Sequence, residues 1–128
     1  MTNQLDRLPL ILIIDDDRSM RLLLTMALEE LDYRVVEAKN GEQVLADYAE
    51  YQPSLILLDA MMPDIDGFTC CQKIRSLPEG DRPSIIIITA LDDRESIQKA
   101  LDAGANDYIT KPIQWSVLLD KVRRLLNP

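Results

Sequence analysis

The stretch Leu10-Ile11-Leu12-Ile13-Ile14-Asp15-Asp16-Asp17 decides the fold, because five apolar residues run without a polar break and then meet three acids. Such a run is typical of a strand with both faces covered, as in a parallel sheet between layers of helices. Residues 55–58 and 85–88 form runs of the same kind. Residues 33–38 alternate and predict an edge strand, and residues 107–110 predict a short fifth strand.

Segments with helical periodicity separate these strands. Further helices are expected after Asn40-Gly41, around residues 71–77, from Asp92 or Asp93 onward, and after Pro112, which should open the last one. Five alternating strand–helix units predict an α/β fold, a flavodoxin-like doubly wound five-stranded parallel sheet in the order 2-1-3-4-5 with five helices. The first helix should bury a stripe at helical spacing: Met20, Leu23, Leu24, Ala27, Leu28 and Leu31.

Composition excludes several classes of function. The 128 residues include 14 basic and 22 acidic side chains, a formal charge of −8, and no histidine. Without histidine the chain cannot form a Ser-His-Asp triad, a Cys-His dyad or a histidine-ligated zinc site. A surface this acidic repels phosphate backbones and anionic lipids. We therefore expect no direct binding to nucleic acid or to a membrane.

Length and cysteine usage predict one cytoplasmic domain. We expect a single domain over residues 1–128, with a loose lead-in at 1–8 and a core at about 9–126. The apolar run at 8–14 is too short for a membrane span and is wrongly flanked for a signal peptide. Cys70 and Cys71 are adjacent and make no disulfide framework, which indicates a reducing compartment.

Acids at two strand ends predict a metal site. In an open parallel sheet, ligands bind beyond the carboxyl ends of the strands, where the strand order reverses. Asp15 and Asp16 end the first strand and Asp59 ends the third, so these carboxylates should converge there. Carboxylate oxygens without Cys or His select Mg²⁺, Mn²⁺ or Ca²⁺. Helix capping is the simpler explanation for Asp17, but it does not account for Asp59.

Two further strand ends supply groups that suit a phosphoryl group. Thr89 closes the fourth strand and is followed by the small Ala90, and Lys111 follows the fifth strand and precedes Pro112. Taken alone, each has an ordinary structural explanation. Together with the acids they provide a cation, a lysine charge and a hydroxyl around an anion. The Lys-Pro bond can also be cis, which would fix the direction of the lysine.

Four motifs, in order, resemble the receiver domain of two-component response regulators. They are the strand ending in Asp15-Asp16-Asp17, the segment Asp59-Ala60-Met61-Met62-Pro63-Asp64-Ile65-Asp66-Gly67, the pair Thr89-Ala90, and the pair Lys111-Pro112. The resemblance runs from about residue 10 to 126. It implies a phosphoprotein that carries an aspartyl phosphate and is a signalling domain, with no enzymatic activity beyond its own phosphorylation and slow dephosphorylation.

The resemblance also implies a role for each site residue. Asp59 matches the phosphoacceptor, Asp16 a direct Mg²⁺ ligand, Asp15 a ligand acting through water, and Met61 a ligand through its backbone carbonyl. Lys111 would pair with phosphoryl oxygens and Thr89 would bond one of them. Tyr108 matches an aromatic switch residue that turns inward when Thr89 moves. Mn²⁺ could substitute for Mg²⁺. Met61 and Leu91 occupy variable positions that influence water access, and both are apolar.

The implied partners are a phosphohistidine donor and an output. Because the chain has no histidine, a sensor histidine kinase or a histidine phosphotransfer protein must supply the phosphoryl group. The output surface would comprise residues 92–103, 107–110 and 114–126, and homodimers formed through the fourth and fifth helices are common in this family. The sequence leaves open a stand-alone regulator or the N-terminal receiver of a longer protein, such as a cyclic-di-GMP cyclase or a hybrid kinase.

Two other functions remain as alternatives at this point. Asp15-x-Asp17 after a strand is similar to the nucleophile motif of haloacid-dehalogenase-like phosphatases, with Asp15 as nucleophile, but nothing in that family corresponds to Asp59 with Gly67. An FMN-binding flavodoxin shares the topology, but three acids after the first strand would repel the FMN phosphate. The identity of the phosphorylated aspartate, or a yellow colour, distinguishes them.

Overall fold

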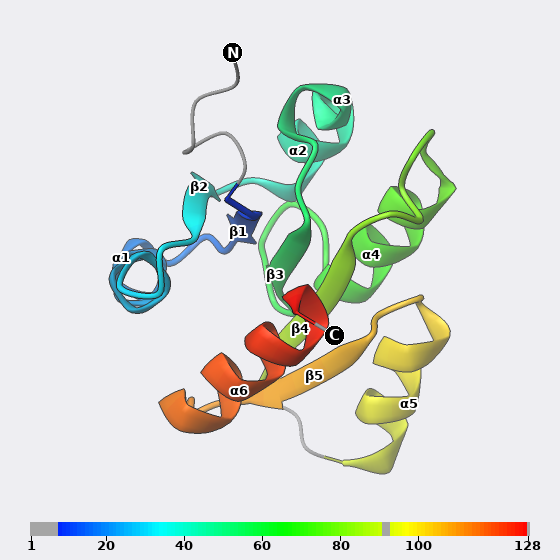
Figure 1. The fold of residues 1–128 in the computed structure, drawn as a ribbon. Helices are drawn as coiled ribbons and strands as arrows, with labels where there is room; N and C mark the ends of the chain where they lie inside the picture. Colours follow the sequence, from blue (N-terminus) through cyan, green and yellow to red (C-terminus); the bar gives the residue numbers. More distant parts are fainter. Residues whose placement is uncertain (1–7, 91–92, 128) are drawn as a thin grey trace.

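The computed structural model describes residues 8–90 and 93–127, and it consists of a central sheet with helices on both faces (Figure 1). Strands and helices alternate along the chain: β1 (Leu10–Ile14), α1 (Arg18–Glu29), β2 (Arg34–Ala38), α2 (Gly41–Ala46), α3 (Tyr48–Tyr51), β3 (Leu55–Asp59), α4 (Gly67–Ser76), β4 (Ser84–Thr89), α5 (Arg94–Asp102), β5 (Asp107–Thr110) and α6 (Trp115–Leu126).

The sheet is parallel throughout, with the order β2-β1-β3-β4-β5, as predicted. The apolar runs form its three central strands, β1, β3 and β4, and their inner residues are buried on both faces. Strands β2 and β5 form the edges and are only half buried. The strand order reverses between β1 and β3, so the carboxyl ends of these two strands lie next to each other at the switch point.

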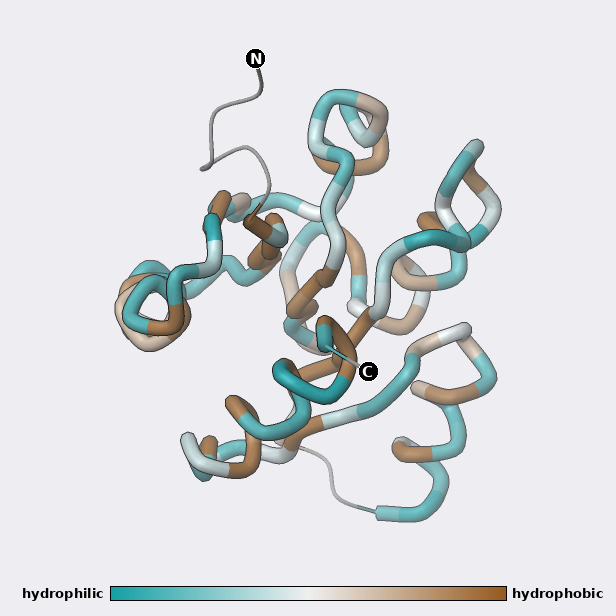
Figure 2. The backbone as a smooth tube through the Cα atoms, viewed as in Figure 1, coloured by the Kyte–Doolittle hydropathy of each residue, from teal (hydrophilic) through white to brown (hydrophobic). Residues whose placement is uncertain are grey.

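Each face of the sheet has its own hydrophobic core. One core packs Leu24 and Leu28 of α1, and Leu118 and Val122 of α6, against one face. The opposite core contains buried residues of α2 to α5. In Figure 2 the central strands are among the most hydrophobic parts of the chain, and polar residues alternate with apolar ones along the helices. Burial in two layers therefore fixes the register of the strands and brings their ends to one edge.

The helices differ from the prediction in two places. The described part of the chain has six helices, because the second helical segment is interrupted at Asp47 (φ −111°, ψ 20°) and continues as α3. Aspartate favours such turns, since its side chain competes for nearby backbone groups. The last helix begins at Trp115, after a cap at Gln114, rather than at Pro112. The start of α5 agrees with the prediction, because Asp93 is its N-cap; Asp92 lies outside the described residues.

The predicted stripe on α1 is correct for Leu24 and Leu28 and wrong for Leu23, which is 50% exposed. Three consecutive leucines cannot all face the sheet at 3.6 residues per turn, and Leu24 is the one that does. Leu22, Leu23 and Met26 therefore form an exposed apolar patch, called here the α1 patch. Most of the predicted lead-in, residues 1–7, lies outside the described residues. None of the described helices combines the length and apolar character needed to cross a bilayer.

Candidate functional site

Three carboxylates meet at the switch point. Asp15 and Asp16 follow β1, Asp59 is the last residue of β3, and one carboxylate oxygen from each lies within 4.8 Å of the others. Asp15 is 1% exposed and Asp59 is 4% exposed, whereas Asp16 is on the surface. The sequence argument had placed these acids together from the strand order alone, and the structure brings them together.

Hydrogen bonds from three backbone amides fix the loop after β1. The Asp15 amide donates to the carbonyl of Ala38 at 3.0 Å, which continues the pairing of β1 with β2. The Asp17 amide donates to Asp15 Oδ1 at 2.9 Å, and Asp17 caps α1 by accepting from the Ser19 amide, as expected. The second oxygen of Asp15, Oδ2, is buried and has no hydrogen-bond partner among the described residues.

Burial and mutual repulsion make the ionised acids costly. Burial, with a further contribution from the Asp59 charge, raises the pKa of Asp15 to about 6, against the opposing bond from the Asp17 amide and the charge of Lys111. Burial also raises the pKa of Asp59, and the Lys111 ammonium offsets part of that shift. A buried oxygen without a partner, inside an all-oxygen donor set, fits a hard divalent cation such as Mg²⁺.

Lys111 is the cation already present at the site. Its Nζ lies 3.2 Å from Asp59 Oδ1, and its backbone amide donates to the carbonyl of Thr89 at 2.8 Å. The peptide bond between Lys111 and Pro112 is cis, as the sequence had allowed. Lys111 therefore joins the ends of β3, β4 and β5.

Thr89 and Tyr108 lie on the strands beside this cluster. Asp59 pairs with Ile88 in the sheet register, so Thr89, the last residue of β4, is one step beyond it and is buried. Tyr108 is half-buried on the edge strand β5. Lys121 of α6 lies 5.1 Å from the centre of its ring and donates to its backbone carbonyl at 3.0 Å. Tyr108 thus contacts α6.

The loop after β3 shapes the other side of the site. The Met61 amide lies 3.4 Å from Asp59 Oδ1, and the Met61 side chain is 65% exposed beside it. Leu91, the second position expected to influence water access, lies outside the described residues. Gly67 begins α4, and its amide donates to the Ala60 carbonyl at 2.8 Å. A Cβ at Gly67 would lie 2.4 Å from the Asp59 carbonyl oxygen, a constraint that the sequence alone does not reveal.

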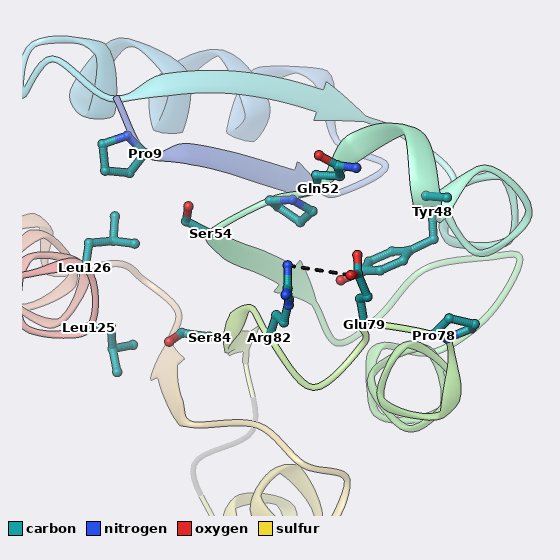
Figure 3. A pocket seen from close by; sticks show the side chains of 12 residues that line it. Pro9, Tyr48, Gln52, Ser54, Pro78, Glu79, Arg82, Ser84, Leu125 and Leu126 are labelled. Atoms are coloured by element: carbon teal, nitrogen blue, oxygen red, sulfur yellow. Dashed lines mark ion pairs between the residues drawn. The ribbon is translucent and has the colours of Figure 1, made fainter. Parts of the chain in front are cut away.

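A cavity of about 880 Å³ lies at the opposite end of the sheet (Figure 3). Residues that precede or begin strands, Pro9, Ser54 and Ser84, line it together with Tyr48. Arg82 and Glu79 form an ion pair at its rim, with 3.6 Å between Nη1 and Oε1. It contains none of the predicted site residues. The acidic cluster is therefore the candidate site, because convergent charged groups decide the chemistry and cavity size does not.

Comparison with known proteins identifies the family. The model of the response regulator receiver domain matches residues 11–123, so the chain belongs to this family of signalling domains. It is 40% identical over 120 residues to the transcriptional regulatory protein AfsQ1 of Streptomyces coelicolor, covering 94% of this chain and 52% of AfsQ1. The chain thus spans about half the length of the first curated relatives that it matches.

Solved structures agree with this assignment. A two-component response regulator from Clostridium difficile matches with a TM-score of 0.85 and 33% identity, covering 92% of this chain and 95% of that one. The receiver domain of the sensor histidine kinase PA1611 from Pseudomonas aeruginosa, solved with magnesium coordinated in its active-site cleft, matches with a TM-score of 0.85 and 28% identity over 94% and 99% of the two chains. The family match favours the receiver over the phosphatase and flavodoxin alternatives.

Proposed function

We propose that Asp59 accepts a phosphoryl group from a phosphohistidine of a partner protein. One observation carries the proposal: Asp59 is buried in a cluster of three acids and is paired with Lys111 at 3.2 Å. Such a site holds a nucleophilic carboxylate beside a fixed positive charge. Incubation with Mg²⁺ and acetyl phosphate tests it, because intact-mass spectrometry should then detect one added phosphoryl group. No adduct would contradict it.

In the proposed transfer Asp59 is the group that reacts, and the other site residues place positive charge around it. A carboxylate oxygen of Asp59 attacks phosphorus, the P–N bond to the donor imidazole breaks, and an acyl phosphate remains on Asp59. Lys111 Nζ is close enough to Asp59 to pair with the incoming phosphoryl oxygens. Mg²⁺ held by Asp15, Asp16, Asp59 and the Met61 carbonyl would neutralise charge during transfer, and Mn²⁺ has the same ligand preference.

The signal would leave through α5, β5 and α6. Thr89 and Lys111 end β4 and follow β5, so a phosphoryl group that attracts both would draw these strand ends toward Asp59. Tyr108 on β5 would turn inward as Thr89 moves. The surface formed by α5, β5 and α6 would then present a new shape to an output domain or protein, or to a second copy of the chain.

The α1 patch is a suitable surface for the phosphohistidine donor. Leu22, Leu23 and Met26 are each at least half exposed on a helix that begins directly after Asp15 to Asp17. An apolar surface beside the site allows a donor to dock while its imidazole reaches Asp59. We infer a sensor histidine kinase or a histidine phosphotransfer protein as donor, because this chain contains no histidine.

The setting of the domain follows from composition and relatives. We infer a single receiver domain over residues 1–128 that works in the cytoplasm and, with a charge of −8, does not itself bind nucleic acid or membrane. Since its relatives are about twice as long, we infer that it controls an output module. Transcriptional control, as in the name of AfsQ1, is one such output, and a cyclic-di-GMP cyclase or a hybrid kinase is another.

Binding of Mg²⁺ should be coupled to loss of a proton. Because the pKa of Asp15 is raised to about 6, this ligand is ionised at pH 8 and protonated at pH 5. A proton competes with the metal, so Mg²⁺ affinity should be constant above pH 7 and fall about tenfold for each pH unit below 6. Calorimetric titration with MgCl₂ at several pH values measures this. An affinity independent of pH from 5 to 8 would contradict the raised pKa.

The phosphorylated protein should lose its phosphoryl group slowly. Met61 is exposed next to Asp59, and its thioether cannot orient a water molecule for attack on the acyl phosphate. We expect a half-life of minutes or longer after the phosphodonor is removed, followed by intact mass. Met61→Gln adds a polar group at the same place and should shorten it. A wild-type half-life of a few seconds would disprove the expectation.

A further inference from the structure

Arg21 of α1 connects the acidic loop to the edge of the sheet. Its Nη1 donates to the backbone carbonyl of Asp15 at 2.8 Å, and its Nε donates to Glu37 Oε1 on β2 at 3.2 Å. The side chain is only 14% exposed, unlike that of a typical surface arginine. A guanidinium group that makes two hydrogen bonds and is largely buried has a fixed orientation.

The bond from Arg21 completes a set of contacts around one residue. The Asp15 amide is held by Ala38, its Oδ1 by the Asp17 amide, and its carbonyl by Arg21. That carbonyl belongs to the peptide group between Asp15 and Asp16. Its orientation therefore determines where the Asp16 side chain leaves the backbone, and hence whether both acids can approach Asp59.

The contact does not neutralise the acids. Arg21 bonds the Asp15 carbonyl and not its carboxylate, and the largest charge contributions at that carboxylate come from Asp59, Lys111 and Asp16. Its own charge is paired with Glu37. The two possible roles of Arg21 predict opposite effects on Mg²⁺ affinity. If Arg21 acts only through its charge, its removal should strengthen Mg²⁺ binding, because a cation near the site repels the metal. If Arg21 positions the ligands, its removal should weaken Mg²⁺ binding.

We propose that Arg21 is a positioning residue of the metal site, which fixes the Asp15–Asp16 peptide so that both carboxylates face Asp59. Glu37 holds the guanidinium in place, so the edge strand β2 takes part in shaping the site. This inference rests on the proposed function, since it concerns the same site. Groups that orient metal ligands typically change metal affinity about 10- to 100-fold when they are removed.

Calorimetric titration of the full chain with MgCl₂ at pH 8 tests the proposal. Arg21→Gln should weaken Mg²⁺ binding about tenfold. The matched control is Arg18→Gln, an exposed arginine in the first turn of the same helix, which should leave the affinity unchanged or slightly stronger. Arg21→Gln binding that equals or exceeds the wild-type affinity would overturn the positioning role.

A conservative variant keeps the test decisive. If circular dichroism shows that Arg21→Gln does not fold, Arg21→Lys is titrated instead. It retains the charge but replaces the fork by one ammonium group, so binding should still be several-fold weaker, and a wild-type affinity would overturn the inference. If the wild-type protein binds no Mg²⁺, the proposed metal site itself is wrong. If the wild-type protein and the Arg21→Gln variant bind Mg²⁺ equally well, the metal site stands and the role of Arg21 is wrong.

Discussion

Asp59→Asn is expected to abolish phosphorylation completely. Asparagine is close in shape to aspartate, but its amide is a far weaker nucleophile than a carboxylate and cannot form an acyl phosphate. Intact-mass spectrometry after incubation with Mg²⁺ and acetyl phosphate should show one phosphoryl adduct on the wild-type protein and none on the variant. The substitution also relieves the repulsion that Asp59 adds to Asp15, so the variant should remain folded.

Asp15→Asn is the matched control. Asp15 is also buried in the cluster, but in the proposed chemistry it helps to hold the metal and does not react. The Asp15→Asn variant should therefore be phosphorylated slowly at low Mg²⁺ concentration and at the wild-type rate at high Mg²⁺ concentration. An adduct that survives in Asp59→Asn and disappears in Asp15→Asn would reverse the roles and favour a phosphatase-like nucleophile at Asp15.

Gly67→Ala is expected to destabilise the fold by about 3 kcal/mol, at the upper end of the usual cost of overpacking. The new methyl group would lie 2.4 Å from the Asp59 carbonyl oxygen and 2.7 Å from the Ala60 Cα. Both are backbone atoms at the end of a central strand and cannot move aside without displacing Asp59. Urea unfolding, followed by circular dichroism, measures the change, and phosphorylation of the variant should also slow.

Gly41→Ala is the control for this prediction. Gly41 also begins a helix after a capping residue, and its Cβ would meet Ile65 Cγ2 at 2.7 Å. The other close atoms, Cys70 Sγ and Met62 Cε at 3.3 Å, also belong to side chains, which adjust more easily than backbone, so the expected cost is smaller, about 1 kcal/mol. Equal losses at the two glycines would show that contact with the Asp59 backbone is not the cause.

The sheet and the acidic cluster could be predicted because both follow from strong local signals. The runs at 10–14, 55–58 and 85–88 have no polar residue, and helical segments separate them, which is typical of a parallel sheet covered by helices on both faces. Once the order 2-1-3-4-5 is given, the ends of β1 and β3 must adjoin. The proximity of Asp15, Asp16 and Asp59 is therefore a consequence of topology.

Other features depend on contacts that a single sequence does not encode. The exposure of Leu23 depends on how α1 rotates when it packs, because Leu22, Leu23 and Leu24 are equally apolar. The roles of Gly67 and Arg21 depend on the approach of backbone groups from distant segments. In the sequence Gly67 is one glycine of four, and Arg21 is one of 14 basic residues.

The separation between the α1 patch and the strand ends has a consequence for cells that contain several such domains. The charged groups of the candidate site lie at the ends of β1 and β3 and directly after β5, whereas Leu22, Leu23 and Met26 are exposed on α1 and are not part of the acidic cluster. If the donor docks on this patch as proposed, substitutions there should change which donor is recognised and leave the proposed transfer chemistry intact. On that proposal, parallel pathways would share one reaction and be kept separate by surface shape.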